Sequence, residues 1–327
     1  MAGGQERVLR RRINSVQSTR KITRAMELIA ASRIVRAQAR VAAAVPYSDL
    51  ITEVVRDLGA ESTGVESPLL TRRPEITKVG HVVLTADRGL CGAYNSSVIR
   101  AAEGSMREQD EQGRDYALFL VGRKAESYFR YRNFRIDSTF SGFSDQPSYE
   151  NARTIADAVR ESYLEGHVDM VELIYTRFIS AGRQEVVVRP LMPLDRDVVL
   201  GGDAKPSASA TAAYEFEPSP ELILERLLPR YAEARVYAAL LNAAASEHAA
   251  RQRAMKSATD NADDLMTSLR RVMNRARQDA ITTEIMEVVG GAEALRHGKH
   301  PHADDMLVDA IDGSRTDPRA RERGASR

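Results

Sequence analysis

The residues of this chain with the most potential for chemistry lie in a short loop that combines an acid, two glycines and a cysteine. The loop reads DRGLCG (residues 87–92) and follows an apolar run at residues 79–85, where many nucleotide-binding proteins carry a phosphate-binding loop. It matches neither G-x-G-x-x-G nor the Walker pattern, and two glycines are too few to form a backbone cradle. The sequence therefore favours a structural strand-to-helix turn over a nucleotide site.

Cysteine and histidine give no stronger signal. Cys91 is the only cysteine, so no internal disulfide can form, and no histidine stands at a spacing that pairs with it as a base. We interpret it as a buried or half-buried thiol in a reducing compartment. His297, His300 and His302 could bind a metal, but such a pattern near a terminus is weak support. No paired carboxylates or Ser/His/Asp spacing stand out, so we expect no catalytic residue, cofactor or metal.

Composition narrows the class of protein. The 327 residues carry 47 Lys and Arg against 46 Asp and Glu, so net charge gives no reason to expect nucleic acid as a partner. Only 6% of residues are aromatic and there is no Trp, which suits alanine-rich helix packing better than a large aromatic core. No apolar run approaches the roughly 20 residues of a membrane span, and the Arg-rich start lacks an apolar signal core. We expect a soluble chain with no cleaved leader.

The C-terminal part of the chain predicts one very long helix. Residues 230–289 contain no glycine or proline and are rich in strong helix formers. Apolar residues recur every three or four positions, which is typical of a coiled-coil seam that needs a partner helix of similar length. His248 and Arg251 interrupt this register. Its apolar members are Leu241, Ala244, Met255, Ala258, Ala262, Leu265, Leu269, Val272 and Ala276.

Residues 5–58 predict the partner helix. Its register passes through polar Arg20, Thr23 and Glu27, while Ile22, Met26 and Ile29 form a second, shifted apolar line. Because the two helices lie at opposite ends of the chain with a domain between them, an antiparallel pair is the simplest arrangement. The apolar members of the first register include Ile34, Ala37, Val41, Ala44, Ile51, Val55 and Leu58, with Ser48 among them.

Residues 10–40 are strongly basic, with nine basic residues and a single acidic one, Glu27. A solvated helix face is the bland explanation, but the imbalance favours an acidic partner surface. Nucleic acid is the competing partner, although the stretch has no interleaved aromatic residues for base stacking.

Between the helices, strand-like and helix-like segments alternate, which predicts a mainly parallel sheet with helices on its faces. Strands are expected at 79–85, 116–121, 135–140, 168–179 and 185–193, the last pair antiparallel. The predicted fold is thus α/β plus an antiparallel coiled coil, with a Rossmann-like domain inserted between the long helices. The expected divisions are a first helix at 1–58, the domain at 76–200, a flexible loop at 201–219, a second helix at 220–294 and a disordered tail at 295–327.

Four motifs, in this order, resemble the gamma subunit family of bacterial F-type ATP synthases. They are KITRAMELIAAS (21–32), TADRGLCG (85–92), MKSATDNA (255–262) and NRARQDAITTEI (274–285), within a match that extends over about residues 1–294. The resemblance implies a rotor shaft that couples proton-driven rotation of the c-ring to conformational change at catalytic sites on beta subunits. The chain departs from the family pattern in an enlarged loop after Gly201 and a longer tail.

The resemblance also implies partners and contact residues. The partners are three alpha and three beta subunits, epsilon and the c-ring, with no nucleic acid, and with membrane association only through the complex, at the cytoplasmic face of the cell membrane. Implied contacts with a beta subunit are Lys21, Arg24, Met26, Arg251, Gln278, Thr282 and Glu284. Implied contacts with the c-ring and epsilon are Phe216 and Glu217. The subunit would carry out no chemistry itself.

Two alternatives remain at this point. The first is a dinucleotide- or phosphate-binding enzyme built on the α/β domain, with the helices as a dimerisation stalk. A fuller glycine loop or a catalytic pair would support it. The second is a basic coiled-coil scaffold for nucleic acid.

Overall fold

The computed structural model describes residues 2–61, 67–194 and 219–297. These fall into two compact units, one formed by residues 2–15 and 265–297 and the other by the described residues from 16 to 264. Phe216, Glu217, the loop predicted at 201–219 except its last residue, and the tail from residue 298 onward lie outside the described residues.

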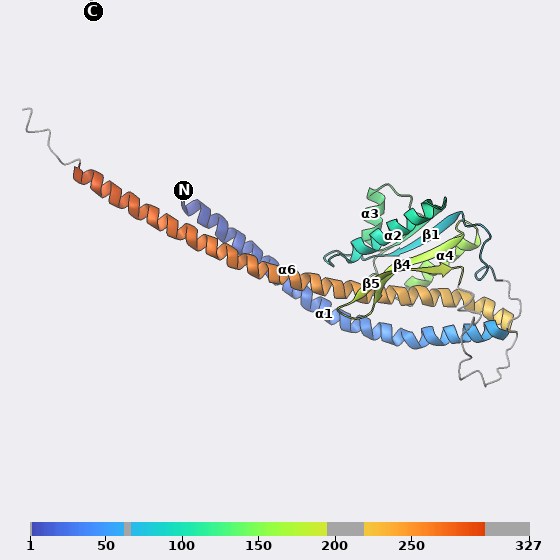
Figure 1. Cartoon of the computed structure of the whole chain (residues 1–327). Coiled ribbons are helices and arrows are strands. Elements are labelled where there is room, and N and C mark those ends of the chain that lie inside the picture. The colour runs from blue at the N-terminus through green and yellow to red at the C-terminus, as the bar shows by residue number, and fades with distance from the viewer. Residues whose placement is uncertain (1, 62–66, 195–218, 298–327) are drawn as a thin grey trace, which may run out of the picture. The chain divides into compact units, whose positions relative to one another are not determined.

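Two helices account for much of the chain: α1 (Ala2–Glu61) and α6 (Pro220–His297) (Figure 1). Both run farther than the sequence predicts, and both continue through an internal proline, Pro46 or Pro229. Helix α6 begins at a proline, which tolerates a first helical position because the N–H there has no intrahelical acceptor. The hydroxyl of Ser219 just before it accepts a hydrogen bond from the Leu222 N–H at 3.4 Å, as an N-cap residue does.

Within the unit from residue 16 to 264, the two helices pack antiparallel, as predicted. At one level the Thr23 and Thr259 hydroxyls lie 2.8 Å apart. At the other end, Val55 of α1 shares a buried cluster with Leu224 and Leu228 of α6. Residue numbers therefore increase along α1 in the direction in which they decrease along α6, so the two helices are antiparallel.

The predicted seam is correct along most of its length. On α1, Ile34, Ala37, Ile51, Val55 and Leu58 are buried. On α6 two predicted members beyond Ala262 are wrong: Leu265 and Val272 are 41% and 48% exposed, and Met266 is buried, whereas Leu269 is buried as predicted. The buried stripe runs through Met255, Thr259, Ala262, Met266 and Leu269 in steps of four and three residues, so alternate members lie one position later than predicted. The sequence-based prediction differs because it takes the apolar Ala258 into the register in place of the polar Thr259.

The inserted domain is built on a five-stranded sheet of order β3-β2-β1-β4-β5. The first four strands are parallel and β5 pairs antiparallel to β4, as the sequence predicts. The strands are β1 (Lys78–Leu84), β2 (Asp115–Val121), β3 (Ser138–Phe140), β4 (Met170–Phe178) and β5 (Gln184–Met192). Strand β3 is shorter than expected because the Asp137 carboxylate, rather than a backbone carbonyl, accepts the Leu118 N–H at 2.8 Å.

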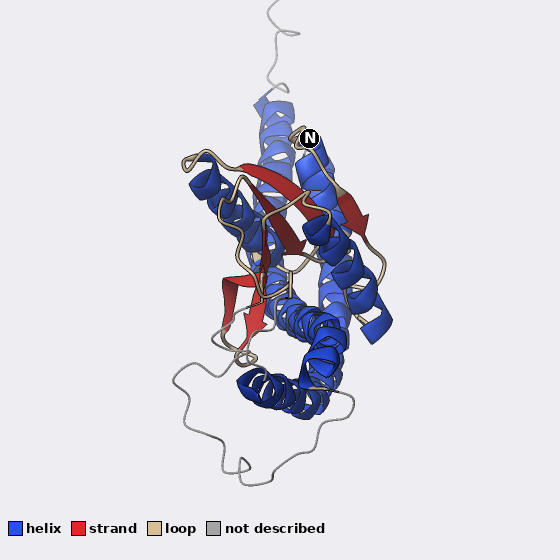
Figure 2. Ribbon diagram, turned by 90° about the vertical axis from the view of Figure 1, so that its right-hand side faces the viewer, coloured by secondary structure: helices blue, strands red, loops and turns tan. Residues whose placement is uncertain are grey.

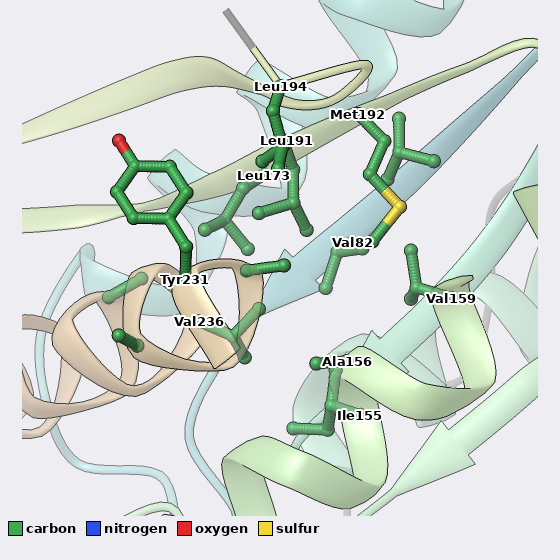
Figure 3. Close-up of a cluster of buried hydrophobic side chains, with 14 of the residues drawn as sticks. Val82, Ile155, Ala156, Val159, Leu173, Leu191, Met192, Leu194, Tyr231 and Val236 are labelled. Carbon is green, nitrogen blue, oxygen red and sulfur yellow. The ribbon is translucent and has the colours of Figure 1, made fainter. Parts of the chain in front are cut away.

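Helices cover both faces of this sheet (Figure 2). On one face, side chains of α2 (Tyr94–Asp110) and α3 (Arg123–Tyr131) join alternate residues of β1, β2 and β4 in a buried cluster. On the other face, α4 (Tyr149–Leu164) and the two long helices form the larger core. Figure 3 shows part of this core, where Val236 of α6 and Ile155 of α4 meet Val82 of the sheet. The domain therefore shares one hydrophobic core with the helix pair.

Candidate functional site

The predicted contacts on α1 occupy a basic surface. Lys21 and Arg24 are exposed and Met26 is half-buried. The Arg24 guanidinium donates to both carboxylate oxygens of Glu27, at 2.9 and 3.0 Å. Glu27 is 8% exposed, so the only acidic side chain of this stretch turns inward and its charge is compensated by Arg24. The net positive character that the sequence indicates is kept at the surface.

The seam beside this surface is polar, and apolar side chains face outward. Thr23 and Thr259 bond across the seam, and the Arg20 guanidinium lies 2.7 Å from the Asp263 carboxylate. Ile22 is 61% exposed, as the polar register of the sequence implies. Leu28 and Ile29 are also more than half exposed, at 58% and 55%. Large apolar side chains beside a basic stripe mark a surface suited to a protein partner.

The far end of α6 is exposed on every side. Gln278, Thr282 and Glu284 are all exposed, and the Thr282 hydroxyl donates to the Gln278 carbonyl at 2.9 Å. From residue 281 to 296 every side chain is exposed. These include six large apolar side chains: Ile281, Ile285, Met286, Val288, Val289 and Leu295. A helix with this much exposed apolar surface needs a surrounding partner to be stable in water.

Arg251 occupies a different environment from the other predicted contacts. It is 8% exposed, and its guanidinium lies 2.7 Å from the Glu247 carboxylate. It also donates to the carbonyl of Gly89 at 3.3 Å and, at 3.5 Å, to that of Arg88. The guanidinium is thus engaged within the chain, and its expected contact with a beta subunit stays a prediction.

Arg251 belongs to a buried polar junction, a name we use for Arg33, Asp145, Glu247, His248 and Arg251 together. Arg33 of α1 bonds the Asp145 carboxylate at 2.6 Å, and the Nε2 of His248 lies 3.2 Å from the Asp145 carbonyl. Nδ1 of His248 lies 3.5 Å from the Arg251 guanidinium, so Nδ1 accepts and Nε2 carries the proton. The junction joins both long helices to the loops that follow β1 and β3.

Burial sets the protonation of the junction. Burial lowers the pKa of His248 to about 4, so the imidazole is neutral. The hydrogen bond to the Asp145 carbonyl acts in the opposite direction, and the Arg251 charge lowers the pKa further. Burial raises the pKa of the Glu247 carboxyl, although the Arg251 charge acts in the opposite direction. Glu247 is 1% exposed and is not among the residues predicted from the sequence. Its spacing from Arg251, four residues along one helix, is the signal that could have found it.

The DRGLCG loop is structural, as the sequence indicates. Oδ2 of Asp87 accepts the backbone N–H groups of Gly142 and Ser144 at 2.9 and 3.0 Å. Burial alone would raise the pKa of Asp87, but these N–H groups and that of Arg123 outweigh it and lower the pKa. The acid therefore ties the loop after β1 to the loop after β3.

Cys91 is a buried thiol rather than a nucleophile. It is 1% exposed and accepts a hydrogen bond from the Asn95 amide at 3.0 Å. Burial raises the pKa of the thiol above its ordinary value, which disfavours the reactive thiolate. Within the described ranges no group of three metal-binding side chains occurs, and no helix combines the length and apolar character needed to cross a membrane.

Comparison with known proteins decides the family. Residues 5–295 match the family model described as ATP synthase. The ATP synthase gamma chain of Parafrankia sp. (strain EAN1pec) is 50% identical over 299 residues, which cover 90% of this chain and 99% of the relative. The chain belongs to the ATP synthase gamma chain family. The gamma chain of Kineococcus radiotolerans is 47% identical over 296 residues, covering 89% of this chain and 97% of that one.

Chains in solved ATP synthase structures are similar to this chain in fold. A chain of the Euglena gracilis mitochondrial ATP synthase (OSCP/F1/c-ring, rotational state 3) aligns with a TM-score of 0.64 at 18% identity, covering 92% of this chain and 98% of that chain. A chain of the Tetrahymena thermophila central stalk and c-ring aligns with a TM-score of 0.55 at 25% identity, covering 72% of this chain and 99% of that chain. The first likeness shows the shared fold. Family membership over 5–295 displaces the enzyme-with-stalk and nucleic-acid alternatives.

Proposed function

We propose that this chain is the central rotor shaft of a bacterial F-type ATP synthase. It turns with a proton-driven c-ring and biases the catalytic sites on the beta subunits in turn. The observation that carries the proposal is the end of α6, where every side chain from residue 281 to 296 is exposed although many are apolar. A head of three alpha and three beta subunits around this helix would supply the missing partner surface.

The contacts with the head divide into two kinds. Lys21, Arg24 and Met26 offer positive charge with exposed apolar neighbours, which suits an acidic loop of a beta subunit. Gln278, Thr282 and Glu284 offer polar groups in an apolar surround. Contacts of this kind differ between rotational positions, and only such differential contacts can shift a beta subunit among states of different nucleotide affinity.

The buried polar junction has a transmitting role in this proposal. It bonds α1 and α6 to the loops at one end of the sheet, through Arg33, Asp145 and Arg251. Epsilon and the c-ring would grip the α/β domain, with Phe216 and Glu217 as the expected contacts. Rotation applied to the domain then passes to the helices through the junction and the common core. The complex would hold the chain at the cytoplasmic face of the cell membrane as a peripheral subunit.

Co-purification tests the assignment. The full chain, expressed with the alpha and beta subunits of its own organism, should be recovered with both in one complex. A chain that is folded but is recovered without them would overturn the proposal.

A charge test addresses the contact surface. Lys21→Ala with Arg24→Ala should weaken coupling between the proton gradient and ATP yield, and should reduce its sensitivity to salt. Arg20 and Arg33 are poor choices because they pair with Asp263 of α6 and Asp145 of the α/β domain, whereas Arg24 is 59% exposed and pairs within its own helix, with Glu27. Arg153→Ala on the exposed side of α4 is the matched control. Unchanged coupling in the double variant would remove the electrostatic contact from the proposal.

A further inference from the structure

A cleft of 390 Å³ opens at the start of α2. It lies between the first turn of α2, strands β4 and β5, and the middle of α6, and its lining includes Cys91, Tyr94, Ser97, Thr176, Gln184 and Arg253. The chain leaves β1 into α2 on one face of the sheet and returns to β4 from α4 on the other, so strand order reverses between β1 and β4. In open α/β sheets, ligands bind outside the carboxyl ends of the strands at this switch point.

The beginning of α2 directs positive potential into the cleft. The helix has 17 residues, and its N-cap residue is Ala93, whose side chain makes no capping hydrogen bond. The Tyr94 N–H donates to the Cys91 carbonyl at 3.2 Å. The next N–H groups of the first turn have no intrahelical acceptor, and with the helix dipole they favour an anion. Ala93 itself lines the cleft.

Two side chains give independent support for a ligand. Thr176 is 5% exposed and lines the cleft, yet its Oγ1 has no hydrogen-bond partner among the described residues. Buried hydroxyls nearly always have a partner, so this one has a hydrogen bond still to make. Arg253 donates to the Ala181 carbonyl at 2.6 Å and to the Gln184 amide oxygen, which are both neutral. No ion pair found among the described residues includes Arg253, so its charge is uncompensated there.

We propose that this cleft binds a phosphate group. Arg253 and the first turn of α2 supply positive charge, and the Thr176 hydroxyl donates a hydrogen bond from the buried floor. The size of the cleft is at the lower end of the range for small-molecule sites. The phosphate group could be free inorganic phosphate or part of a nucleotide, and the two share this chemistry. The proposal is independent of the rotor function.

Calorimetric titration of the purified full chain tests the proposal and separates the two sources. Inorganic phosphate and ATP are titrated separately without magnesium, and sodium chloride at matched ionic strength controls for screening. Saturable binding of phosphate supports a free-phosphate site, and binding of ATP alone supports a nucleotide site. Binding of neither, or equal heats with chloride, overturns the proposal.

Two variants and a control locate the site. Arg253→Gln should weaken binding about tenfold, because a charge-assisted bond is lost. Arg183→Gln, which removes an exposed charge on the β4–β5 hairpin outside the lining, should leave binding unchanged. Binding as tight in Arg253→Gln as in the original chain would overturn the assignment.

Thr176→Val distinguishes a ligand site from a folding defect. Removing an unpaired buried hydroxyl should raise the unfolding temperature of the free chain, while the stabilisation by added phosphate or ATP becomes smaller. A lower unfolding temperature together with unchanged affinity would show that the hydroxyl is already satisfied by water, and the assignment would fail.

Discussion

Glu247 and Arg251 lie one turn apart on α6, with 2.7 Å between carboxylate and guanidinium and almost no exposure of either side chain. The same guanidinium reaches the carbonyl of Gly89 in the loop after β1. Ion pairs on helix surfaces are screened by water and contribute little, whereas a buried charge depends on its partner. A single substitution in this pair should therefore weaken the contact between the α/β domain and α6.

Glu247→Gln should lower the free energy of unfolding by about 3–5 kcal/mol, because Arg251 is then buried without a counter-charge. Chemical denaturation of the full chain measures this. Glu126→Gln breaks a pair of the same spacing on α3, where Arg130 is 70% exposed, and should cost less than about 1 kcal/mol. Equal losses in the two variants would contradict the importance of burial.

Stability should fall as pH decreases from 6.5 toward 4, and His248 is the main cause in the upper part of this range. Its pKa is about 4 in the folded chain, whereas an ordinary histidine has a pKa of 6.5. As the pH falls, His248 therefore takes up a proton in the unfolded chain before it does so in the folded chain. The loss reaches on the order of 3 kcal/mol by pH 4. Glu247, with a raised pKa, opposes this at the acidic end because it takes up a proton more readily when folded.

A variant isolates the histidine contribution. His248→Gln keeps an N–H donor for the Asp145 carbonyl but cannot titrate, so its unfolding free energy should vary less between pH 6.5 and 4. Denaturation at a series of pH values compares the two slopes. If the slopes are the same, His248 is not the titrating group.

Gly122→Ala should prevent stable folding or cost more than about 4 kcal/mol. Gly122 has a φ of +91°, and an added Cβ would lie 2.2 Å from the Thr85 carbonyl oxygen. Gly113, with φ of +72° and no atom within 4 Å of an added Cβ, provides the matched control, and its alanine variant should cost about 1 kcal/mol. Thermal unfolding of both proteins checks the difference, which would be absent if the loop could shift.

Ile285→Ser with Val289→Ser should leave the unfolding free energy of the isolated chain within about 0.5 kcal/mol, because both side chains are more than half exposed. Affinity for the alpha and beta subunits should fall at least about tenfold, since apolar burial on assembly is lost. Quantitative pull-down of the subunits measures this. Normal assembly by the variant would show that α6 does not bind through this end.

Periodicity predicted the long helices, the parallel sheet and most of the seam, because burial along a helix or strand follows simple repeats. It could not place Arg251, since an arginine in an apolar register can face a partner or turn inward. Its nearest partner, Glu247, lies four residues away on the same helix, but the other groups that hold it inward are distant in sequence: the Gly89 carbonyl and, through His248, the Asp145 carbonyl. The cleft beside α2 was missed for the same reason, because Thr176 and Arg253 approach the loop only in the folded chain.

The hydroxyls of Thr23 and Thr259 meet across the seam, whose buried members farther along α1 are the apolar Ala30, Ile34 and Ala37. Thr259 also donates to the Met255 carbonyl within its own helix at 2.9 Å. Slippage of one helix along the other by a single turn, about 5.4 Å, would break this bond and bury hydroxyls against carbon. The Thr23–Thr259 pair therefore fixes the register of the two helices along their length. Torque applied to one helix is then transmitted to the other helix without the two sliding along each other.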